Sequence, residues 1–164
     1  MSVISVDKDF DALTLTVIAD FAAPAERVWR LWADPRQLER WWGPPSHPAT
    51  VIDHDLTPGG EVTYYMTSPE GEKFRGWWRF TEVDPVTSLE FLDGFADADG
   101  KPVEGMPVNT VRMRLSAHDG GTRMELRSVF DSREQMDQLI GMGMAEGLEQ
   151  SVGQIDALLA QPTG

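Results

Sequence analysis

Residues 132–159 read SREQMDQLIGMGMAEGLEQSVGQIDALL, and this stretch has the pattern of a long amphipathic helix. Ser132, followed three residues later by Gln135, forms a capping box that predicts the start of the helix. Apolar residues then recur every three or four positions, the spacing of a single apolar stripe. The stripe consists of Met136, Ile140, Met144, Leu148, Val152, Ile155 and Leu159. We therefore expect one continuous helix from Ser132 to about Ala160, with one face to bury.

Four glycines interrupt this stretch, at Gly141, Gly143, Gly147 and Gly153. Each weakens a helix by about 1 kcal/mol relative to alanine. They indicate either close approach of the helix backbone to the rest of the protein or flexibility beside a cavity. Simple tolerance in a well-packed helix is an equal alternative.

The chain before this helix reads mainly as strands separated by turn residues. Strands are predicted over residues 13–21, 50–56, 61–67, 73–83, 88–95, 108–117 and 122–130. The last six follow one another through short connections without room for crossover helices, so their pairing is predicted to be mainly antiparallel. Two short helices follow the first strand, where Pro24 opens one and Asp34 caps the next ahead of Pro35.

These elements predict an α+β fold in which a seven-stranded antiparallel sheet wraps around the long C-terminal helix. The chain has 164 residues, which is the length of one domain, so residues 1–164 are expected to form a single unit.

The composition excludes several classes of function. Fourteen Lys and Arg residues against 27 Asp and Glu residues give a net charge of −13, so neither nucleic acid nor a membrane surface is expected as a partner. The absence of cysteine excludes disulfides, thiolate zinc sites and cysteine nucleophiles. No apolar run approaches the roughly 20 residues of a membrane span, and the first residues do not resemble a secretory signal. We therefore predict a cytoplasmic protein.

No nucleotide-binding, phosphate-binding or zinc-protease motif occurs in the sequence, so no cofactor is expected. The three histidines are His47, His54 and His118. His118 lies beside the turn formed by Asp119 and Gly120, which separates it from the other two. No metal site is therefore predicted.

Strand alternation places aromatic and methionine side chains on the face that should turn toward the helix. Such a lining, with a few polar groups, is typical of a pocket for an apolar ligand, because methionine adapts to irregular shapes. The polar candidates are His54, Tyr64 and Asp93. The alternative for each side chain is ordinary core packing. The candidate cavity residues are Trp41, Trp42, His54, Tyr64, Met66, Trp78, Phe91, Met113, Met136, Ile140 and Met144.

Three of these positions have distinct alternatives. His54, expected on the same face as Ile52, is either a pocket group able to transfer a proton or a hydrogen-bonded histidine at the edge of the core. Trp41 and Trp42 either both pack into the core, or one of them lines a cavity mouth.

The opposite face of the sheet carries arginine and glutamate residues, which predicts a solvated surface with cross-strand ion pairs. Alternation places Trp78 inside and Trp77 outside, among these arginines. An exposed Trp77 would anchor a partner protein or a second copy of the chain.

Several motifs resemble the family of activators of the heat-shock-protein-ninety ATPase, which belongs to the START-like, birch-pollen-allergen-like (SRPBCC) superfamily. The resemblance spans about residues 13–159. It departs from the family pattern at Thr57, where arginine is usual, and at Leu148, where many members carry tryptophan. The motifs are PAERVW at 24–29, LERWWGP at 38–44, DLTPGG at 55–60, GTRM at 121–124 and GMAEGL at 143–148.

The resemblance implies a helix-grip fold with a hydrophobic cavity between sheet and helix. It leaves three functions open: binding of a small hydrophobic or aromatic molecule, a co-chaperone role that stimulates a chaperone ATPase, and a polyketide cyclase or aromatase reaction in which His54 or Tyr64 moves a proton. An apolar lining without a paired nucleophile and base favours binding over catalysis.

Overall fold

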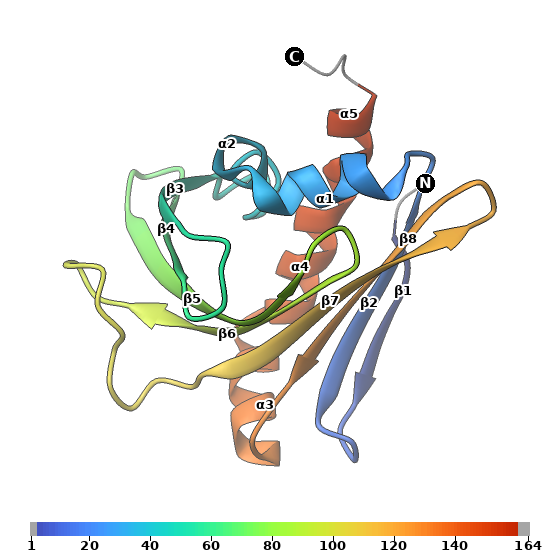
Figure 1. The fold of residues 1–164 in the computed structure, drawn as a ribbon. Helices are drawn as coiled ribbons and strands as arrows, with labels where there is room; N and C mark the ends of the chain where they lie inside the picture. Colours follow the sequence, from blue (N-terminus) through green and yellow to red (C-terminus); the bar gives the residue numbers. More distant parts are fainter. Residues whose placement is uncertain (1–2, 161–164) are drawn as a thin grey trace.

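The computed structural model describes residues 3–160 and contains one eight-stranded sheet (Figure 1). All neighbouring strands are antiparallel, in the order β1-β2-β8-β7-β6-β5-β4-β3. The strands are β1 (Val3–Asp9), β2 (Thr14–Phe21), β3 (Ala49–His54), β4 (Glu61–Thr67), β5 (Lys73–Asp84), β6 (Ser88–Ala96), β7 (Asn109–His118) and β8 (Gly121–Val129).

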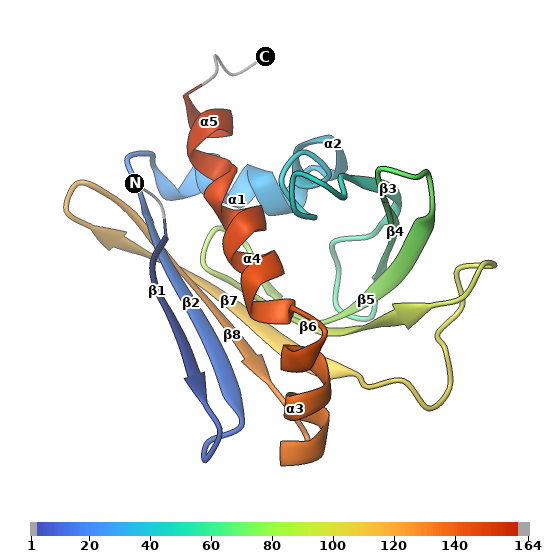
Figure 2. The same ribbon diagram turned by 180° about the vertical axis from the view of Figure 1, so that it is seen from behind.

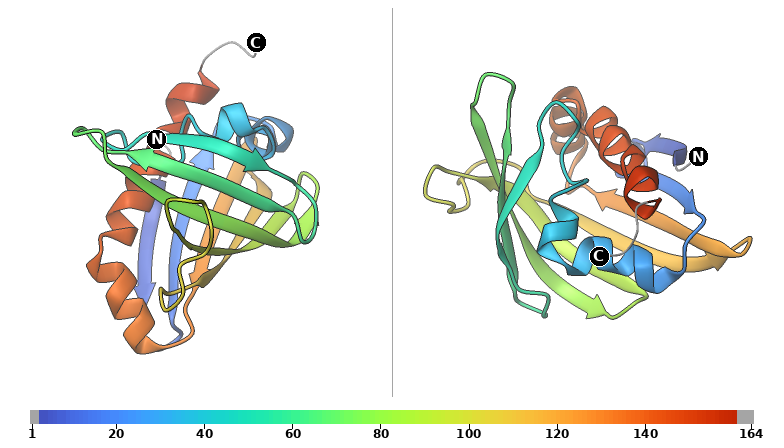
Figure 3. Two further views of the ribbon diagram at one scale, coloured as in Figure 1. Left: turned by 90° about the vertical axis from the view of Figure 1, so that its left-hand side faces the viewer. Right: turned by 90° about the horizontal axis from the view of Figure 1, so that it is seen from above.

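The helices all lie on the concave side of this sheet, which curves around them (Figures 2 and 3). They are α1 (Ala25–Ala33), α2 (Pro35–Leu38), α3 (Arg133–Gly141), α4 (Met144–Gly153) and α5 (Ile155–Leu159). The predicted caps are present, since Asp34 accepts from the Arg36 N–H and Ser132 accepts from the Gln135 N–H. This arrangement confirms the α+β, helix-grip prediction. Among residues 3–160, no helix is long and apolar enough to cross a membrane.

The sheet has one strand more than predicted, because residues 3–9 form β1. This segment lacks the regular alternation of a half-buried strand, and Asp7, Lys8 and Asp9 make it polar. It is an edge strand that pairs only with β2, so charges facing water are tolerated there. Val3 and Val6 of this strand contact the main core, and they do not alternate regularly, so the sequence does not show the pattern of a half-buried strand.

The predicted continuous C-terminal helix is wrong in one respect: it is divided into three segments. The main break is at Gly143, whose φ of +92° is left-handed and ends the regular helix after α3. A second, milder irregularity at Gln154 separates α4 from α5. The alternative of close backbone approach is also wrong, because a Cβ at Gly141, Gly143, Gly147 or Gly153 would have no neighbour within 4 Å.

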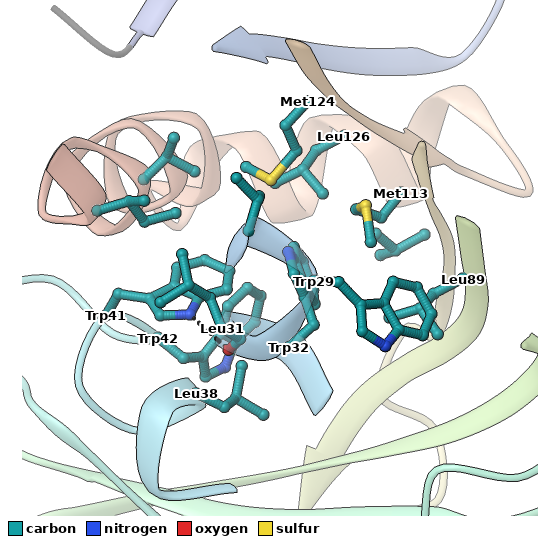
Figure 4. Packing of buried hydrophobic residues seen from close by; sticks show 14 of the residues in the cluster. Trp29, Leu31, Trp32, Leu38, Trp41, Trp42, Leu89, Met113, Met124 and Leu126 are labelled. Atoms are coloured by element: carbon teal, nitrogen blue, oxygen red, sulfur yellow. Dashed lines mark hydrogen bonds between the residues drawn. The ribbon is translucent and has the colours of Figure 1, made fainter. Parts of the chain in front are cut away.

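Two apolar clusters fill the space between sheet and helices. The larger contains the tryptophans of α1 and the α2–β3 connection, packed with Met113 of β7 and Met124 and Leu126 of β8 (Figure 4). The smaller gathers around α3 at the other end of the helical run. Its buried members are Leu15, Phe130, Met136, Leu139 and Ala145.

Hydrogen bonds connect α1 with the segment after α2, and that segment with the C-terminal helices. The Trp41 Nε1–H donates to the Leu31 carbonyl at 2.9 Å. The Gln154 amide donates to the carbonyls of Trp41 at 3.2 Å and Gly43 at 2.8 Å. These bonds fix the end of α4 against the Trp-Trp-Gly-Pro segment.

The outer face of the sheet carries the predicted ion pairs, including Arg79 with Glu61 and Arg112 with Glu90. The exposure expected for Trp77 is wrong, since only 6% of this residue is exposed. Its ring lies across Gly94 on β6, and its Nε1–H donates to the Phe95 carbonyl at 3.0 Å. A glycine opposite an outward tryptophan lets the ring lie flat on the sheet.

An apolar cavity between the sheet and the C-terminal helices

A cavity of about 290 Å³ lies between β4–β7 and the junction of α3 with α4. Trp42 and Pro44, from the segment after α2, form one end of it. The sheet contributes Tyr64, Met66, Phe74, Arg75, Asp93, Phe95 and Asn109, together with Gly76 and Gly94. The helices contribute Leu139, Met142, Met144, Gly147, Leu148 and Ser151. The wall is therefore mostly apolar, with a small number of polar groups.

Four of the candidate residues lie on this wall: Trp42, Tyr64, Met66 and Met144. Asp93, the third polar candidate, lies there as well. Trp41 is fully buried in the core instead, so one tryptophan of the pair lines the cavity and the other packs inside.

The other inward candidates lie elsewhere. Trp78 stacks on Phe91 with ring centroids 4.1 Å apart, and both are fully buried. Met113 packs in the same large cluster, whereas Met136 and Ile140 belong to the small cluster around α3. Strand alternation correctly predicts that these strand residues lie on the inner face of the sheet. Most of that face packs in the hydrophobic core and does not border the cavity.

His54 lies away from the cavity. A β-bulge between Val51 and Asp53 interrupts the alternation of β3, so Ile52 is 54% exposed while His54 turns inward. The expectation that these two residues share a face is wrong for that reason. The His54 Nε2–H donates to the Trp32 carbonyl at 2.9 Å, which is the geometry of the core-edge alternative.

Two large apolar side chains stand at the mouth of the cavity in water. Phe74 on β5 is 52% exposed, and Met142 between α3 and α4 is 56% exposed. Phe74 contacts the His47 ring, with centroids 5.9 Å apart. The helix pattern could not reveal Met142, because this residue lies off the apolar stripe and at the break that the sequence did not predict.

Burial changes the acidity of two polar groups on the wall. It raises the pKa of Asp93 to about 7, because the charged carboxylate loses its hydration. It also raises the pKa of Tyr64 well above its usual value, and the nearby Asp93 charge adds to this effect. Tyr64 is therefore a neutral hydroxyl at physiological pH.

Two wall residues also hold N–H groups without a partner. The Trp42 Nε1–H and the Asn109 amide Nδ2 are buried without a hydrogen-bond acceptor among the described residues. Asn109 was missed by the sequence analysis, and its position at the start of β7 gave no signal beyond strand register. Within residues 3–160, no three His, Asp or Glu side chains gather as a metal site requires.

Comparison with known proteins assigns the family. Residues 22–160 match the model of the family described as activator of Hsp90 ATPase homolog 1-like protein. The chain belongs to this family. The match covers the motifs from the first short helix to the last helical segment, so the resemblance noted in the sequence is confirmed. No curated protein matches the chain in sequence.

Solved structures of similar proteins share the complete fold. Protein Ms6760 from Mycobacterium smegmatis is 52% identical, with 99% of each chain covered and a TM-score of 0.90. A protein from Arthrobacter aurescens is 49% identical, with 99% of this chain and 95% of that chain covered and a TM-score of 0.93. A Staphylococcus epidermidis protein at 21% identity, with 98% of each chain covered and a TM-score of 0.81, shows the fold alone.

Proposed function

We propose that the protein binds a small hydrophobic or aromatic molecule in the cavity between the sheet and α3–α4. The observation that carries this proposal is the preformed apolar space itself, with Phe74 and Met142 exposed at its mouth. Isolated apolar side chains on a surface are common, but two at the entrance of an apolar cavity extend its lining into solvent.

The size of the cavity favours a compact ligand. A volume of about 290 Å³ is near the lower end of the range of about 300–1,000 Å³ for small-molecule sites. A molecule of two or three rings suits this space better than a long acyl chain. Met66, Met142 and Met144 provide the adaptable part of the wall.

The other two functions have less support. The co-chaperone alternative relied on an exposed Trp77, and that ring is covered. The cyclase alternative relied on His54 or Tyr64 as the proton-transfer group. His54 is bonded to a core carbonyl, and Tyr64 holds its proton too firmly to act as a base near neutral pH.

Naphthalene, an aromatic probe without polar groups, tests the proposal. We expect saturable binding by calorimetry, together with a shift of the Trp42 indole N–H signal in ¹H–¹⁵N spectra. The Trp41 indole N–H is the internal reference, because its hydrogen bond to Leu31 holds it in the core. Shifts spread equally over all tryptophans, without saturation, would contradict a defined site.

A pair of glycine substitutions gives the matched control. Gly147 lines the cavity, has no neighbour within 4 Å of an added Cβ and has no positive φ, so Gly147→Leu places a side chain into the space. Gly153 has the same properties on the same helix but does not line the cavity. We expect Gly147→Leu to abolish naphthalene binding and Gly153→Leu to leave it unchanged. Equal binding by both variants would place the ligand elsewhere.

A further inference from the structure

The wall of the cavity contains one pair of polar side chains on adjacent strands. Asp93 of β6 and Asn109 of β7 are directly opposite each other in the register of the sheet, and both line the cavity. Asn109 is only 4% exposed. The pair therefore forms a polar spot on the sheet side of a mostly apolar space.

Within residues 3–160, neither side chain of this pair has a hydrogen-bond partner. The Asn109 Nδ2 group has no acceptor, and the Asp93 carboxyl accepts no hydrogen bond from any residue in the described part of the chain. A buried amide such as that of Asn109 normally has a partner, because leaving it unpaired is costly, whereas Asp93 is partly exposed to the cavity. A pair kept in this state indicates that its partner comes from outside the chain.

In the described part of the chain, no cationic side chain compensates Asp93. On β5, part of Arg75 lies on the wall, but its guanidinium stacks on Tyr65, 5.2 Å from the ring centroid. Tyr65 is next to Tyr64 in β4, so its side chain lies on the opposite face of the sheet, away from Asp93. The titratable side chain that faces Asp93 from β4 is Tyr64, which is neutral. The segments of α3 and α4 on the wall contribute no acidic or basic residue.

The chemistry of the pair selects one type of ligand group. A hydroxyl donates one hydrogen bond to a carboxyl oxygen and accepts another from an amide N–H, so it satisfies both side chains. An ammonium group has no acceptor for Asn109, and a carbonyl or ether oxygen has no donor for Asp93 in its ionised form, which prevails above its pKa of about 7. A carboxylate is repelled by the ionised form of Asp93.

We propose that Asp93 and Asn109 form a subsite that recognises the hydroxyl group of an alcohol or phenol whose remaining atoms are apolar. This inference rests on the proposed ligand-binding function and specifies the class of ligand. The apolar part of the molecule contacts Met66, Met144 and Leu148 and extends toward Phe74 and Met142 at the mouth.

Three probes that share the naphthalene ring and differ in their substituent at position 2 test the subsite: 2-naphthol, 2-methoxynaphthalene and naphthalene. At about pH 8, where Asp93 is ionised, we expect the wild-type protein to bind 2-naphthol at least about tenfold more tightly than 2-methoxynaphthalene, which accepts but cannot donate a hydrogen bond. Asp93→Leu should remove this preference while naphthalene still binds. Asn109→Leu changes the residue on the neighbouring strand, and we expect it to reduce the preference for 2-naphthol while Asp93 is intact.

Asp84→Asn is the control, because this exposed carboxyl at the end of β5 lies outside the cavity, and its variant should keep the full preference. Far-ultraviolet circular dichroism verifies the fold of each variant. If Asp93→Leu does not fold, Asp93→Ser, which removes the carboxyl with a smaller side chain, replaces it in the binding experiment. Naphthalene binding without preference for 2-naphthol in the wild type overturns the subsite and leaves the proposed function standing. The absence of binding by all three probes overturns both.

Discussion

Trp78 is the central residue of the aromatic core. It is fully buried, stacks on Phe91 and contacts the rings of Trp32 and Trp42. Replacement by alanine removes this packing and leaves a cavity, so we expect Trp78→Ala to lower the free energy of unfolding by about 3–5 kcal/mol. Urea denaturation followed by circular dichroism measures this change in the free energy of unfolding. A loss below about 1 kcal/mol would contradict the packing described for this residue.

Trp77 differs from its neighbour in how it is held. Its indole N–H donates to the Phe95 carbonyl, and its ring covers Gly94. Trp77→Phe keeps most of the apolar contact and loses the hydrogen bond, so we expect a destabilisation of about 1 kcal/mol in the same denaturation experiment. Trp77→Ala should cost clearly more than Trp77→Phe. If the two variants are equally stable and match the wild type, the ring is not packed on the sheet.

The buried Asp93 carboxyl makes stability depend on pH. Its pKa is about 7 in the folded protein against an ordinary value of 3.8, so between these values the folded protein holds more protons than the unfolded chain. Stability then falls as pH rises from about 4 to 7 and becomes level above that range. We expect the difference in unfolding free energy between Asp93→Asn and the wild type to grow in favour of the variant across this range. A difference that does not change with pH would contradict the raised pKa.

At the residue scale, alternation predicted which side chains face inward but not which of them border open space. Trp78 and Tyr64 share the inner face, yet only Tyr64 lies on the cavity wall. Whether an inward side chain borders the cavity depends on where the helices leave space above the sheet, and the identity of a single residue does not determine this. Ile52 was expected on the inner face beside His54 but is exposed, because the bulge after Val51 has no glycine or proline signal in the sequence.

Among the elements, the break between α3 and α4 depends on a single glycine. Gly143 has a φ of +92°, a conformation that costs alanine about 1–2 kcal/mol. Gly141 lies two residues earlier at the end of α3, with no positive φ and no neighbour within 4 Å of an added Cβ. We expect Gly143→Ala to lower the melting temperature and Gly141→Ala to leave it unchanged or raise it. The opposite order would show that the helix is continuous in solution.

The strands from β2 to β8 were predicted to within about two residues at each end, because turn residues mark their limits clearly. The break at Gly143 was not, since four glycines occur in the same stretch and only the folded chain shows which one adopts positive φ. β1 was missed because it has one partner strand and few buried residues.

Across the whole molecule, the two apolar clusters divide the stability unevenly. The larger joins α1, the central strands and α4–α5, whereas α3 packs mainly on the smaller one. Amide hydrogen exchange should therefore be slowest in β2, β8, β7 and β6 and distinctly faster in α3 than in α4, because local opening of α3 exposes less apolar surface. Uniform protection along α3 and α4 would indicate that they open as one unit.

The helix-grip architecture, with a cavity between sheet and helix, followed from the order of elements together with the family motifs, whereas most of the residues that line the cavity did not. Arg27 of the PAERVW motif and the backbone of the Trp-Trp-Gly-Pro motif show what those motifs provide. Arg27 donates to the Leu158 carbonyl at 3.1 Å, and Gln154 bonds to the backbone of the Trp-Trp-Gly-Pro segment. Both residues fix the scaffold, which explains why the motifs identify the fold and carry little information about a ligand.

The pairing of β2 with β8 affects how the chain folds during its synthesis. It joins Leu15 to Ser128, residues more than a hundred positions apart, whereas the pairs from β3 to β8 join consecutive strands. Closing so long a loop carries an entropic cost that local hairpins do not. On the ribosome, β1, β2 and α1 therefore emerge first but must wait for β8, and the nascent chain completes its sheet only near the end of synthesis.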